Sequence, residues 1–358
     1  MDQTFVPRIA TAPTPIVTGL AFASTTAQRP FESKARDSSA EPTLSCVLPC
    51  RNEGPNLALL MPRLIGEVSK LSHQWEVIVV DDGSNDDTSA ALFEWAQVDG
   101  IRVIQLSRNF GKEAALTAGV KAAAGDVVVT MDADGQHEPS LIAAMLEKWR
   151  EGADVAYAQR LHRHDESLVK RTGTHLFYSL LNRSDRFDVP AGAGDFRLMD
   201  RSVVNALLAL PERNRFLKGL YAWVGFRAVA VPYSPAPRLN GRSHFSFARL
   251  LRLSLDGLTS FTTWPLRAVS LVGFMLAVVS FAYGTYLTVS YFLNGHHIDG
   301  WTTIVVALML FSGIQLVSLG VVGEYVGRIF EEVKQRPLYV VRREMGQGIS
   351  IGVGVGER

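Results

Sequence analysis

Two aspartates, Asp132 and Asp134, end a run of apolar, β-branched residues in the stretch "GDVVVTMDADGQHEP". The pattern indicates two carboxylates at the end of a buried strand. Such a pair either caps the following helix or holds a cation. Hard cations such as Mg²⁺ and Mn²⁺ take few protein carboxylates and complete their shell with phosphate oxygens and water. An Asp-x-Asp pair at a strand end therefore suits a cation that bridges two phosphates.

The elements that must position this pair alternate along the chain. Strands are expected at 44–50, 75–82, 101–106, 126–132 and 154–159, and helices at 57–71, 86–97, 111–124 and 139–150. This alternation favours an α/β fold, with a mostly parallel, doubly wound sheet and helices on both faces. Ligands of such sheets bind at the carboxyl ends of the strands.

Four consecutive strand ends carry polar and charged residues, in "PCRNEGPN", "DDGSNDDT", "SRNFGKEAA" and "DADGQHEP". One aspartate at a strand end is commonly a helix cap, as Asp86 is expected to be, but capping does not explain a whole row. Together with the upstream "DDGS", the Asp132 and Asp134 pair indicates a binding site for a nucleotide sugar.

Net charge and cysteine content restrict the kinds of partner and the cellular compartment that fit this chain. The chain has 358 residues and a formal net charge of +1, so bulk charge does not suggest a nucleic-acid partner. Cys46 and Cys50 have neither the spacing of a zinc site nor that of a disulfide framework. We interpret them as small core or strand-end residues of a protein in a reducing compartment.

Two long apolar runs, 268–293 and 301–323, place this chain among membrane proteins. At roughly 1.5 Å per helical residue, each exceeds the roughly 30 Å hydrocarbon core of a bilayer. Their connection, 294–300, contains no Lys or Arg, whereas both outer flanks are rich in Arg. The positive-inside rule then predicts cytoplasmic flanks. No signal peptide is recognised at the start, so we expect the region before residue 265 and both termini in the cytoplasm.

The segment just before the first apolar run, 245–265, mixes apolar residues with Arg249 and Arg252 and ends near Trp264. It is typical of an interfacial helix that lies on anionic headgroups, or it packs against the spans. A second stretch, 217–226, has the same two interpretations. Residues 1–42 are rich in Thr, Ala, Pro and Ser and are expected to form a flexible tail.

Several motifs resemble a known family. "VLPCRNE", "VVDDGSNDDT", "LSRNFGKEAAL" and "MDADGQHEP" are similar to the successive motifs of family 2 glycosyltransferases. "GAGDFRLMDR", "RNRFLKGLYAWVGF", "PRLNGRSHFS" and "GEYVGRIFEEVKQRPLYVV" narrow the resemblance to the group that contains bactoprenol glucosyltransferases and dolichol-phosphate mannose synthases. The resemblance covers about residues 43–342. It implies a GT-A-like catalytic domain at 43–244, an interfacial helix at 245–265, a transmembrane hairpin at 266–325 and a cytoplasmic segment and tail at 326–358.

The resemblance also implies roles for individual residues. Nucleotide-sugar contacts are expected from Pro49, Asn52, Glu53, Asp81, Asp82, Lys112, Asp132 and Asp134. A Mg²⁺ or Mn²⁺ ion would be held by Asp132, Asp134 and Gln136. Asp195 and Arg197 would form the reacting centre, and the lipid phosphate would contact Arg197, Arg238, Arg242 and His244.

Two positions depart from the family pattern. Gly135 replaces a leucine, which removes an apolar contact but leaves both carboxylates in place. His244 stands where the family usually has a lysine. Because histidine is mostly neutral at pH 7, a phosphate contact at this position is expected to be weaker or pH-dependent.

The implied acceptor is a lipid monophosphate, which is largely dianionic at pH 7 and already a nucleophile. A strong general base is then unnecessary, and catalysis should rest on positioning and on stabilising the departing diphosphate. Asp195 is therefore interpreted as an orienting group and weak base, with a full base or a turn cap as alternatives.

The resulting hypothesis is an inverting, metal-dependent transfer of glucose from UDP-glucose to undecaprenyl phosphate at the plasma (inner) membrane. The alternatives are a polyprenyl-phosphate mannose synthase that uses GDP-mannose, another nucleotide sugar, or a non-enzymatic scaffold for a lipid-sugar flippase. The resemblance also suggests a homotetramer.

Overall fold

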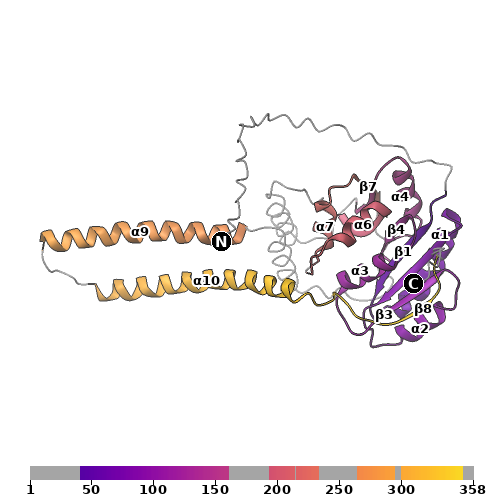
Figure 1. Cartoon of the computed structure of the whole chain (residues 1–358), viewed down its shortest axis with the longest axis horizontal. Coiled ribbons are helices and arrows are strands. Elements are labelled where there is room, and N and C mark those ends of the chain that lie inside the picture. The colour runs from indigo at the N-terminus through magenta and orange to yellow at the C-terminus, as the bar shows by residue number, and fades with distance from the viewer. Residues whose placement is uncertain (1–40, 161–192, 214, 234–263, 295–299, 350–358) are drawn as a thin grey trace, which may run out of the picture. The chain divides into compact units, whose positions relative to one another are not determined.

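The computed structural model describes residues 41–160, 193–213, 215–233, 264–294 and 300–349. Within these ranges an eight-stranded mixed sheet forms the centre of the fold, with the strand order β7-β5-β6-β4-β1-β2-β3-β8 (Figure 1). The strands are β1 (Leu44–Cys50), β2 (Trp75–Asp81), β3 (Ile101–Leu106), β4 (Val127–Thr130), β5 (Val155–Arg160), β6 (Ala193–Asp200), β7 (Ala228–Tyr233) and β8 (Val341–Gly346).

The four strands β4, β1, β2 and β3 lie parallel to one another, as the alternating pattern predicts. They read as nearly continuous apolar runs because helices cover both faces of the sheet. Successive residues point to opposite faces, so Val77 and Val79 of β2 face one core, whereas Ile78 and Val80 face the other. All four side chains are fully buried.

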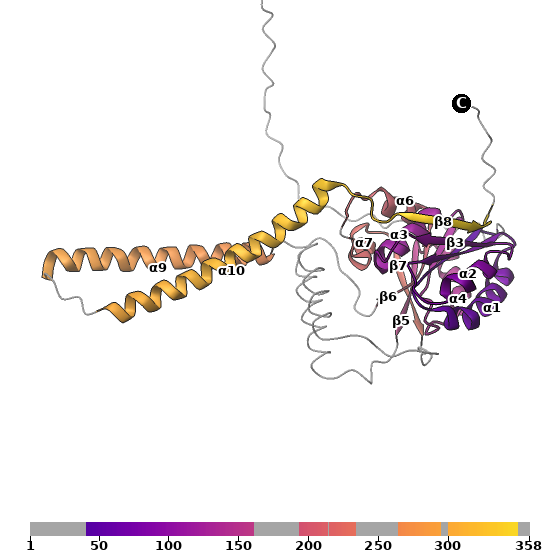
Figure 2. The ribbon, with the colours of Figure 1, turned by 90° about the horizontal axis from the view of Figure 1, so that it is seen from below.

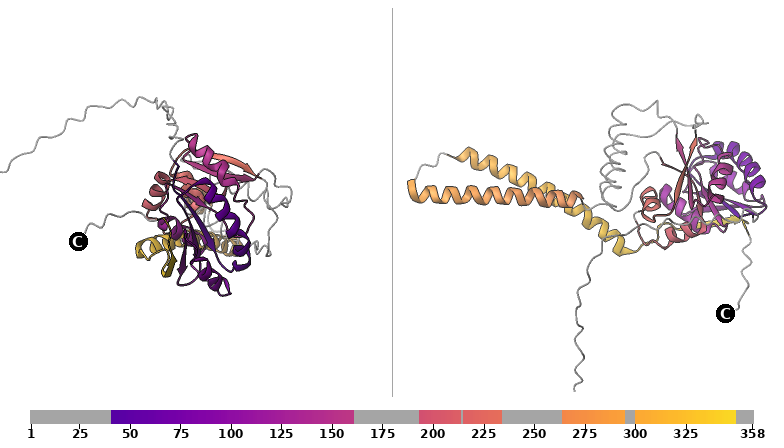
Figure 3. Two further views of the ribbon diagram at one scale, coloured as in Figure 1. Left: turned by 90° about the vertical axis from the view of Figure 1, so that its right-hand side faces the viewer. Right: turned by 90° about the horizontal axis from the view of Figure 1, so that it is seen from above.

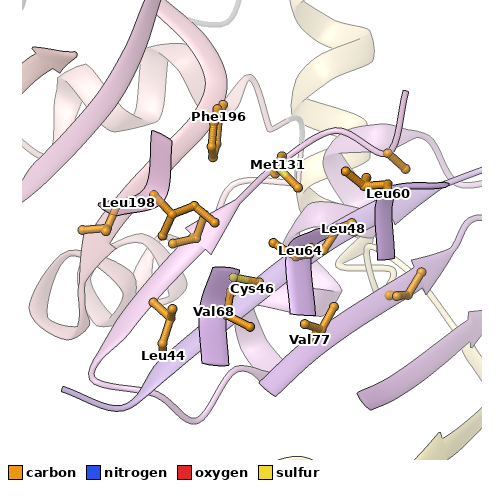
Figure 4. Close-up of a cluster of buried hydrophobic side chains, with 14 of the residues drawn as sticks. Leu44, Cys46, Leu48, Leu60, Leu64, Val68, Val77, Met131, Phe196 and Leu198 are labelled. Carbon is orange, nitrogen blue, oxygen red and sulfur yellow. The ribbon is translucent and has the colours of Figure 1, made fainter. Parts of the chain in front are cut away.

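The helices divide between these two cores. One face is covered by α1 (Gly54–Leu71), α2 (Thr88–Trp95) and α4 (Leu141–Arg150), and the other by α3 (Lys112–Ala122), α6 (Arg201–Ala209) and α7 (Leu217–Trp223) (Figure 3). Figure 4 shows the first core, where Leu60, Leu64 and Val68 of α1 pack over Leu44 and Leu48 of β1. In the second core, Leu217, Leu220 and Tyr221 of α7 are buried. Helix α7 thus packs into the core of the sheet, a position that neither of the two interpretations of 217–226 predicted.

Strands β6, β7 and β8 are absent from the sequence-based predictions. β6 runs antiparallel between β4 and β5, and β8 runs antiparallel to β3 at the edge of the sheet. Both contain charged residues, as in "AGDFRLMD" and "VRREMG", so they lack the apolar signature of the central strands. Through β8, the segment after the last apolar run returns to the sheet (Figure 2).

Two further helices, α9 (Trp264–Asn294) and α10 (Trp301–Lys334), contain the apolar runs. Each is long and apolar enough to cross a membrane. Large apolar side chains remain exposed along both, including Phe274 and Phe281 on α9 and Leu308 and Met309 on α10. A helix that is apolar on all sides and lacks protein cover is suited to lipid surroundings.

Helix α3 approaches the sheet closely at Gly119, and this contact can be tested. A Cβ atom there would overlap the Val47 side chain and lie 3.0 Å from Val80 Cγ2. Gly119→Ala should therefore lower the free energy of unfolding by about 1–3 kcal/mol through overpacking, in spite of the better helix propensity of alanine. Thermal unfolding of the full chain in detergent measures this change.

Gly66→Ala is the matched control, because Gly66 also lies in a helix and no heavy atom lies within 4 Å of its added Cβ. This variant should gain up to about 1 kcal/mol. Equal melting temperatures for the two variants would contradict the close approach of α3.

Candidate functional site

The carboxyl ends of β1 and β2 form a tightly bonded rim. Asp81 is fully buried, and its carboxylate accepts hydrogen bonds from Ser84, Ser89 and Gln105. Asp82 accepts the backbone N–H groups of Phe110 and Gly111 at 2.7 and 2.9 Å. Burial raises the pKa of Asp82, and these two N–H groups oppose the rise. Both aspartates thus hold the chain in place, and their contacts to a nucleotide stay predictions.

The residues after β1 are fixed in the same manner. Asn52 adopts a positive φ of 57°, and its side-chain oxygen accepts the backbone N–H of Asn85 at 3.0 Å. Glu53 accepts a hydrogen bond from Asn56 Nδ2 at 2.5 Å. Pro49 is half-buried within β1. These residues therefore lie at the carboxyl end of β1, where the sequence predicts the nucleotide. Internal hydrogen bonds fix the loops around them.

Lys112, the first residue of α3, joins Asp132 of the Asp-x-Asp pair to Asp195, which the family resemblance places at the reacting centre. Its Nζ lies 2.6 Å from Asp132 Oδ1 and 2.6 Å from Asp195 Oδ2. Burial alone would lower the pKa of Lys112, but the charges of Asp132 and Asp195 raise it above its ordinary value. The ammonium group is therefore a permanent cation at the end of β4.

Asp134 and Gln136 lie in the turn that follows β4. Asp134 Oδ1 accepts the backbone N–H of Gln136 at 3.1 Å, and Gly135 between them has a φ of 73°. A positive φ favours glycine, which gives a physical reason for this residue in a position where the related motif has leucine. Because of this turn, Asp134 stays close to the carboxyl end of β4, which Asp132 also follows.

These residues fit a divalent cation. Asp132 already attracts a positive charge, that of Lys112, and Asp134 adds a second hard oxygen donor. Among the described residues no group of three or more His, Cys, Asp and Glu side chains forms a metal site. Mg²⁺ needs no such cage, because it is commonly bound by one or two carboxylates together with substrate phosphates and water. Asp132, Asp134 and Gln136 are the residues that would hold it.

Asp195 lies on β6, next to the end of β4. Its backbone oxygen accepts a hydrogen bond from the Thr130 hydroxyl at 2.7 Å, which fixes β6 to β4 at this point. Its carboxylate also lies 4.0 Å from Lys218 Nζ. Burial would raise the pKa of Asp195, but Lys112 and Lys218 together lower it to about 2. At neutral pH, Asp195 is an anion held by two cations, which makes it a weak base.

Arg197 is 3% exposed and lies two residues further along β6. Its Nε donates to the Gly194 carbonyl at 3.0 Å, and its guanidinium carbon lies 4.1 Å from the centroid of the Tyr221 ring. The Tyr157 ring is 5.6 Å away on the same measure. Arg197 is thus packed among aromatic rings close to Asp195, and its contact with a lipid phosphate stays a prediction. Arg238, Arg242 and His244, predicted to contact the same phosphate, lie outside the described residues.

The sequence interpretation did not identify Lys218 and Glu113 as site residues. Glu113 follows Lys112 on α3, and both Lys218 and the backbone N–H of Leu217 act to lower its pKa, so its carboxyl lies near the start of α7. Burial raises the pKa of Glu113 to about 7, and the charge of Asp195 adds to the rise. The motif "NFGKEAAL" contains Glu113, but no spacing rule connects it to Lys218.

The raised pKa of Glu113 makes a prediction about stability. A carboxyl with a folded-state pKa near 7 and an ordinary value of 4.5 favours the folded state below pH 4.5, and this contribution is lost as the pH rises through 7. Glu113→Gln should therefore remove about 1–3 kcal/mol of the stability difference between pH 5.5 and 8.5. Melting temperatures of the full chain in detergent at both pH values give this difference.

Glu94→Gln, at an exposed position on α2, is the control and should keep the pH dependence of the wild type. If Glu113→Gln behaves like this control, Glu113 does not titrate near neutral pH.

Similarity to known proteins identifies the family of this chain. The glycosyl transferase family 2 profile matches residues 45–208, and that of the GtrB C-terminal hairpin matches residues 264–329. An uncharacterized glycosyltransferase of Synechocystis is 44% identical over 83% of this chain and 94% of its own length. A prophage-derived bactoprenol glucosyl transferase of Shigella flexneri is 37% identical over 84% of this chain and 97% of its own length.

Among solved structures, a mannosyltransferase from Pyrobaculum calidifontis in complex with GDP-Man and Mn²⁺ is similar, with 19% identity and a TM-score of 0.41. It covers 82% of this chain and 91% of its own. The sequence relatives span nearly their full lengths at more than 30% identity. The chain therefore belongs to glycosyl transferase family 2, carries a GtrB C-terminal hairpin and is a glycosyltransferase.

Proposed function

We propose that this glycosyltransferase transfers glucose from UDP-glucose to undecaprenyl phosphate, with inversion at the sugar carbon. The observation that carries the proposal is the group of Asp132, Lys112 and Asp195, with both carboxylates 2.6 Å from one ammonium group at the carboxyl end of β4. The name of the Shigella flexneri relative, a bactoprenol glucosyl transferase, supports the choice of sugar and acceptor.

On the donor side, the site must stabilise a departing nucleoside diphosphate. Lys112 is a fixed cation on the first turn of α3, beside Asp132. A Mg²⁺ or Mn²⁺ ion held by Asp132, Asp134 and Gln136 would neutralise negative charge on the diphosphate. Lys112 and Lys218 would contribute positive charge to the same region, since cations positioned where charge develops lower the reaction barrier.

On the acceptor side, the phosphate of a polyprenyl phosphate is already a nucleophile at pH 7. The low pKa of Asp195, about 2, makes this residue a poor proton acceptor. Its role is then to orient Lys112 and Lys218 around the reacting centre. Arg197 would hold the acceptor phosphate, because a guanidinium group binds phosphate with two parallel hydrogen bonds.

The hairpin supports the choice of a lipid acceptor. We infer that α9 and α10 cross the plasma membrane as domain 266–325, with the catalytic domain at 43–244 and both termini on the cytoplasmic side. The interfacial helix predicted at 245–265 lies, up to residue 263, outside the described residues. The length and apolar character of both helices support the crossing, and the Arg-rich flanks support the orientation. A homotetramer and a flippase partner are further parts of this proposal.

Sugar transfer by the purified full chain in liposomes tests the proposal. With undecaprenyl phosphate, Mn²⁺ or Mg²⁺ and a panel of radiolabelled UDP- and GDP-sugars, we expect one labelled lipid, formed from UDP-glucose and lost on addition of a chelator. Asp134→Ala should abolish this turnover and leave the protein folded. A labelled lipid from GDP-mannose alone would replace the donor, and bound nucleotide without any lipid product would favour the scaffold function.

Asp195→Asn tests the orienting role of Asp195. The variant keeps the shape of the side chain but loses the charge that holds Lys112 and Lys218, so we expect kcat to fall about 100-fold or more. The Kd of the donor should change less than about threefold. Asp99→Asn, on the exposed surface, is the control and should leave both quantities unchanged. Equal losses in kcat and donor affinity would mean that Asp195 shapes the nucleotide site instead.

A further inference from the structure

A basic pocket of about 810 Å³ lies where the end of α10 meets the loops before α3 and after α6. Five cationic side chains line it, namely Arg108, Arg213, Arg328, Lys334 and Arg336. Two carboxylates, Glu324 and Glu331, line it as well, and Glu324 is paired with Arg328 at 3.0 Å. The pocket is therefore strongly positive.

The other four cations lack such a partner among the residues that the structure describes. Across the described residues, no carboxylate forms an ion pair with Arg108, Arg213, Lys334 or Arg336. Arg108 and Lys334 instead lie over the rings of Phe110 and Phe330, at 4.1 and 3.9 Å from the ring centroids. The pocket contains five cations and only two carboxylates, so its excess positive charges repel one another, and a bound anion removes this repulsion.

The dipole of α10 explains the position of only some of these cations. Lys334 ends α10, where the helix dipole favours a cation. Arg108 and Arg213 come from other elements, and the dipole of α10 does not explain their presence. Arg213 holds the end of α10 through two hydrogen bonds, from its backbone N–H to Glu332 Oε1 and from its guanidinium to the Arg336 carbonyl, both 2.8 Å long.

The position of the pocket indicates which anion it would bind. It begins at Gly323 and Glu324, where the apolar sequence of α10 gives way to charged residues. In a membrane-spanning helix this transition lies at the level of the lipid headgroups. Arginine binds phosphate through forked hydrogen bonds, and lysine binds it as a point charge.

A second, smaller pocket of about 250 Å³ leads from this site toward the reacting centre. The two pockets share Phe110, Arg213 and Leu338, and the smaller one is also lined by Lys112 and Glu113. Lys112 in turn contacts Asp132 and Asp195. Positively charged residues thus continue from the end of α10 to the transfer site.

We propose that the basic pocket binds a lipid-borne phosphate, outside the donor site. The phosphate group can belong to the polyprenyl phosphate acceptor or to an anionic glycerolipid, since both present the same chemistry at the same depth. For the acceptor, the inference rests on the proposed function, and the pocket would be its first binding site before it reaches Asp195.

Lipid binding by the purified full chain tests the proposal without any sugar transfer. Native mass spectrometry in detergent would measure binding of undecaprenyl phosphate, phosphatidylglycerol and inorganic phosphate, each added separately. The test variant is Lys334→Gln with Arg336→Gln, because both side chains are exposed and line the pocket. The control is Arg342→Gln with Arg343→Gln, which removes the same charge from exposed positions of β8 outside the pocket.

We expect the test variant to bind at least one of the two lipids roughly 10- to 30-fold more weakly, at roughly fivefold for each cation removed. The control should stay within about twofold of the wild type. Weaker binding of undecaprenyl phosphate alone would assign the pocket to the acceptor, and weaker binding of phosphatidylglycerol alone would assign it to a glycerolipid.

Unchanged binding of both lipids, or equal losses in the test and control variants, would overturn the proposal. Inorganic phosphate that binds the wild type as tightly as either lipid would overturn it too, because the lipid would then be unnecessary. Sugar transfer measured on the same samples separates this result from the proposed function. If the test variant transfers sugar like the wild type and binds both lipids unchanged, the proposed function holds, and only the proposal for the basic pocket is rejected.

Discussion

The contact of one ammonium group with two carboxylates determines the arrangement of the site. Lys112 lies between Asp132, at the end of β4, and Asp195, on the antiparallel strand β6. Without a cation between them, two carboxylates so close together would repel each other. Lys112 is in turn positioned by Asp82, which binds the backbone N–H groups of Phe110 and Gly111 just before α3. The strand ends and the start of α3 are therefore connected through charge as well as through the core.

The sequence was sufficient to predict the parallel half of this arrangement. The strands β1 to β4 are buried on both faces, so they appear as apolar runs, and the loops after them stand out by polarity alone. The partners from further along the chain were harder to predict. Asp195 was found only through a family resemblance, since β6 is rich in polar residues, and Lys218 was missed because a short buried helix brings it to Asp195.

The charges around Asp195 bear on whether this residue acts as a base or as an orienting group. A carboxylate with a pKa of about 2 binds protons poorly at pH 7, and two lysines stabilise its ionised form. The phosphate of the proposed acceptor needs little deprotonation, so a stronger base at Asp195 would bring small benefit. In the proposed reaction, fixed cations beside the departing diphosphate bring a larger benefit, because they are positioned before charge develops. The site is thus better suited to electrostatic stabilisation than to proton transfer.

The C-terminal segment is attached to the sheet by strand pairing and by hydrogen bonds. After α10 the chain pairs with β3 as β8, and the fully buried Glu76 accepts the Ile349 N–H as well as the Ser45 hydroxyl and the Ala124 N–H. A buried carboxylate is tolerated only where such donors surround it, so Glu76 ties the C-terminal segment firmly to the sheet. Only a short connection separates β8 from Lys334, and Arg213 holds that connection at Arg336. The end of the apolar helix α10 is therefore held at a fixed place beside the sheet by backbone pairing and by hydrogen bonds.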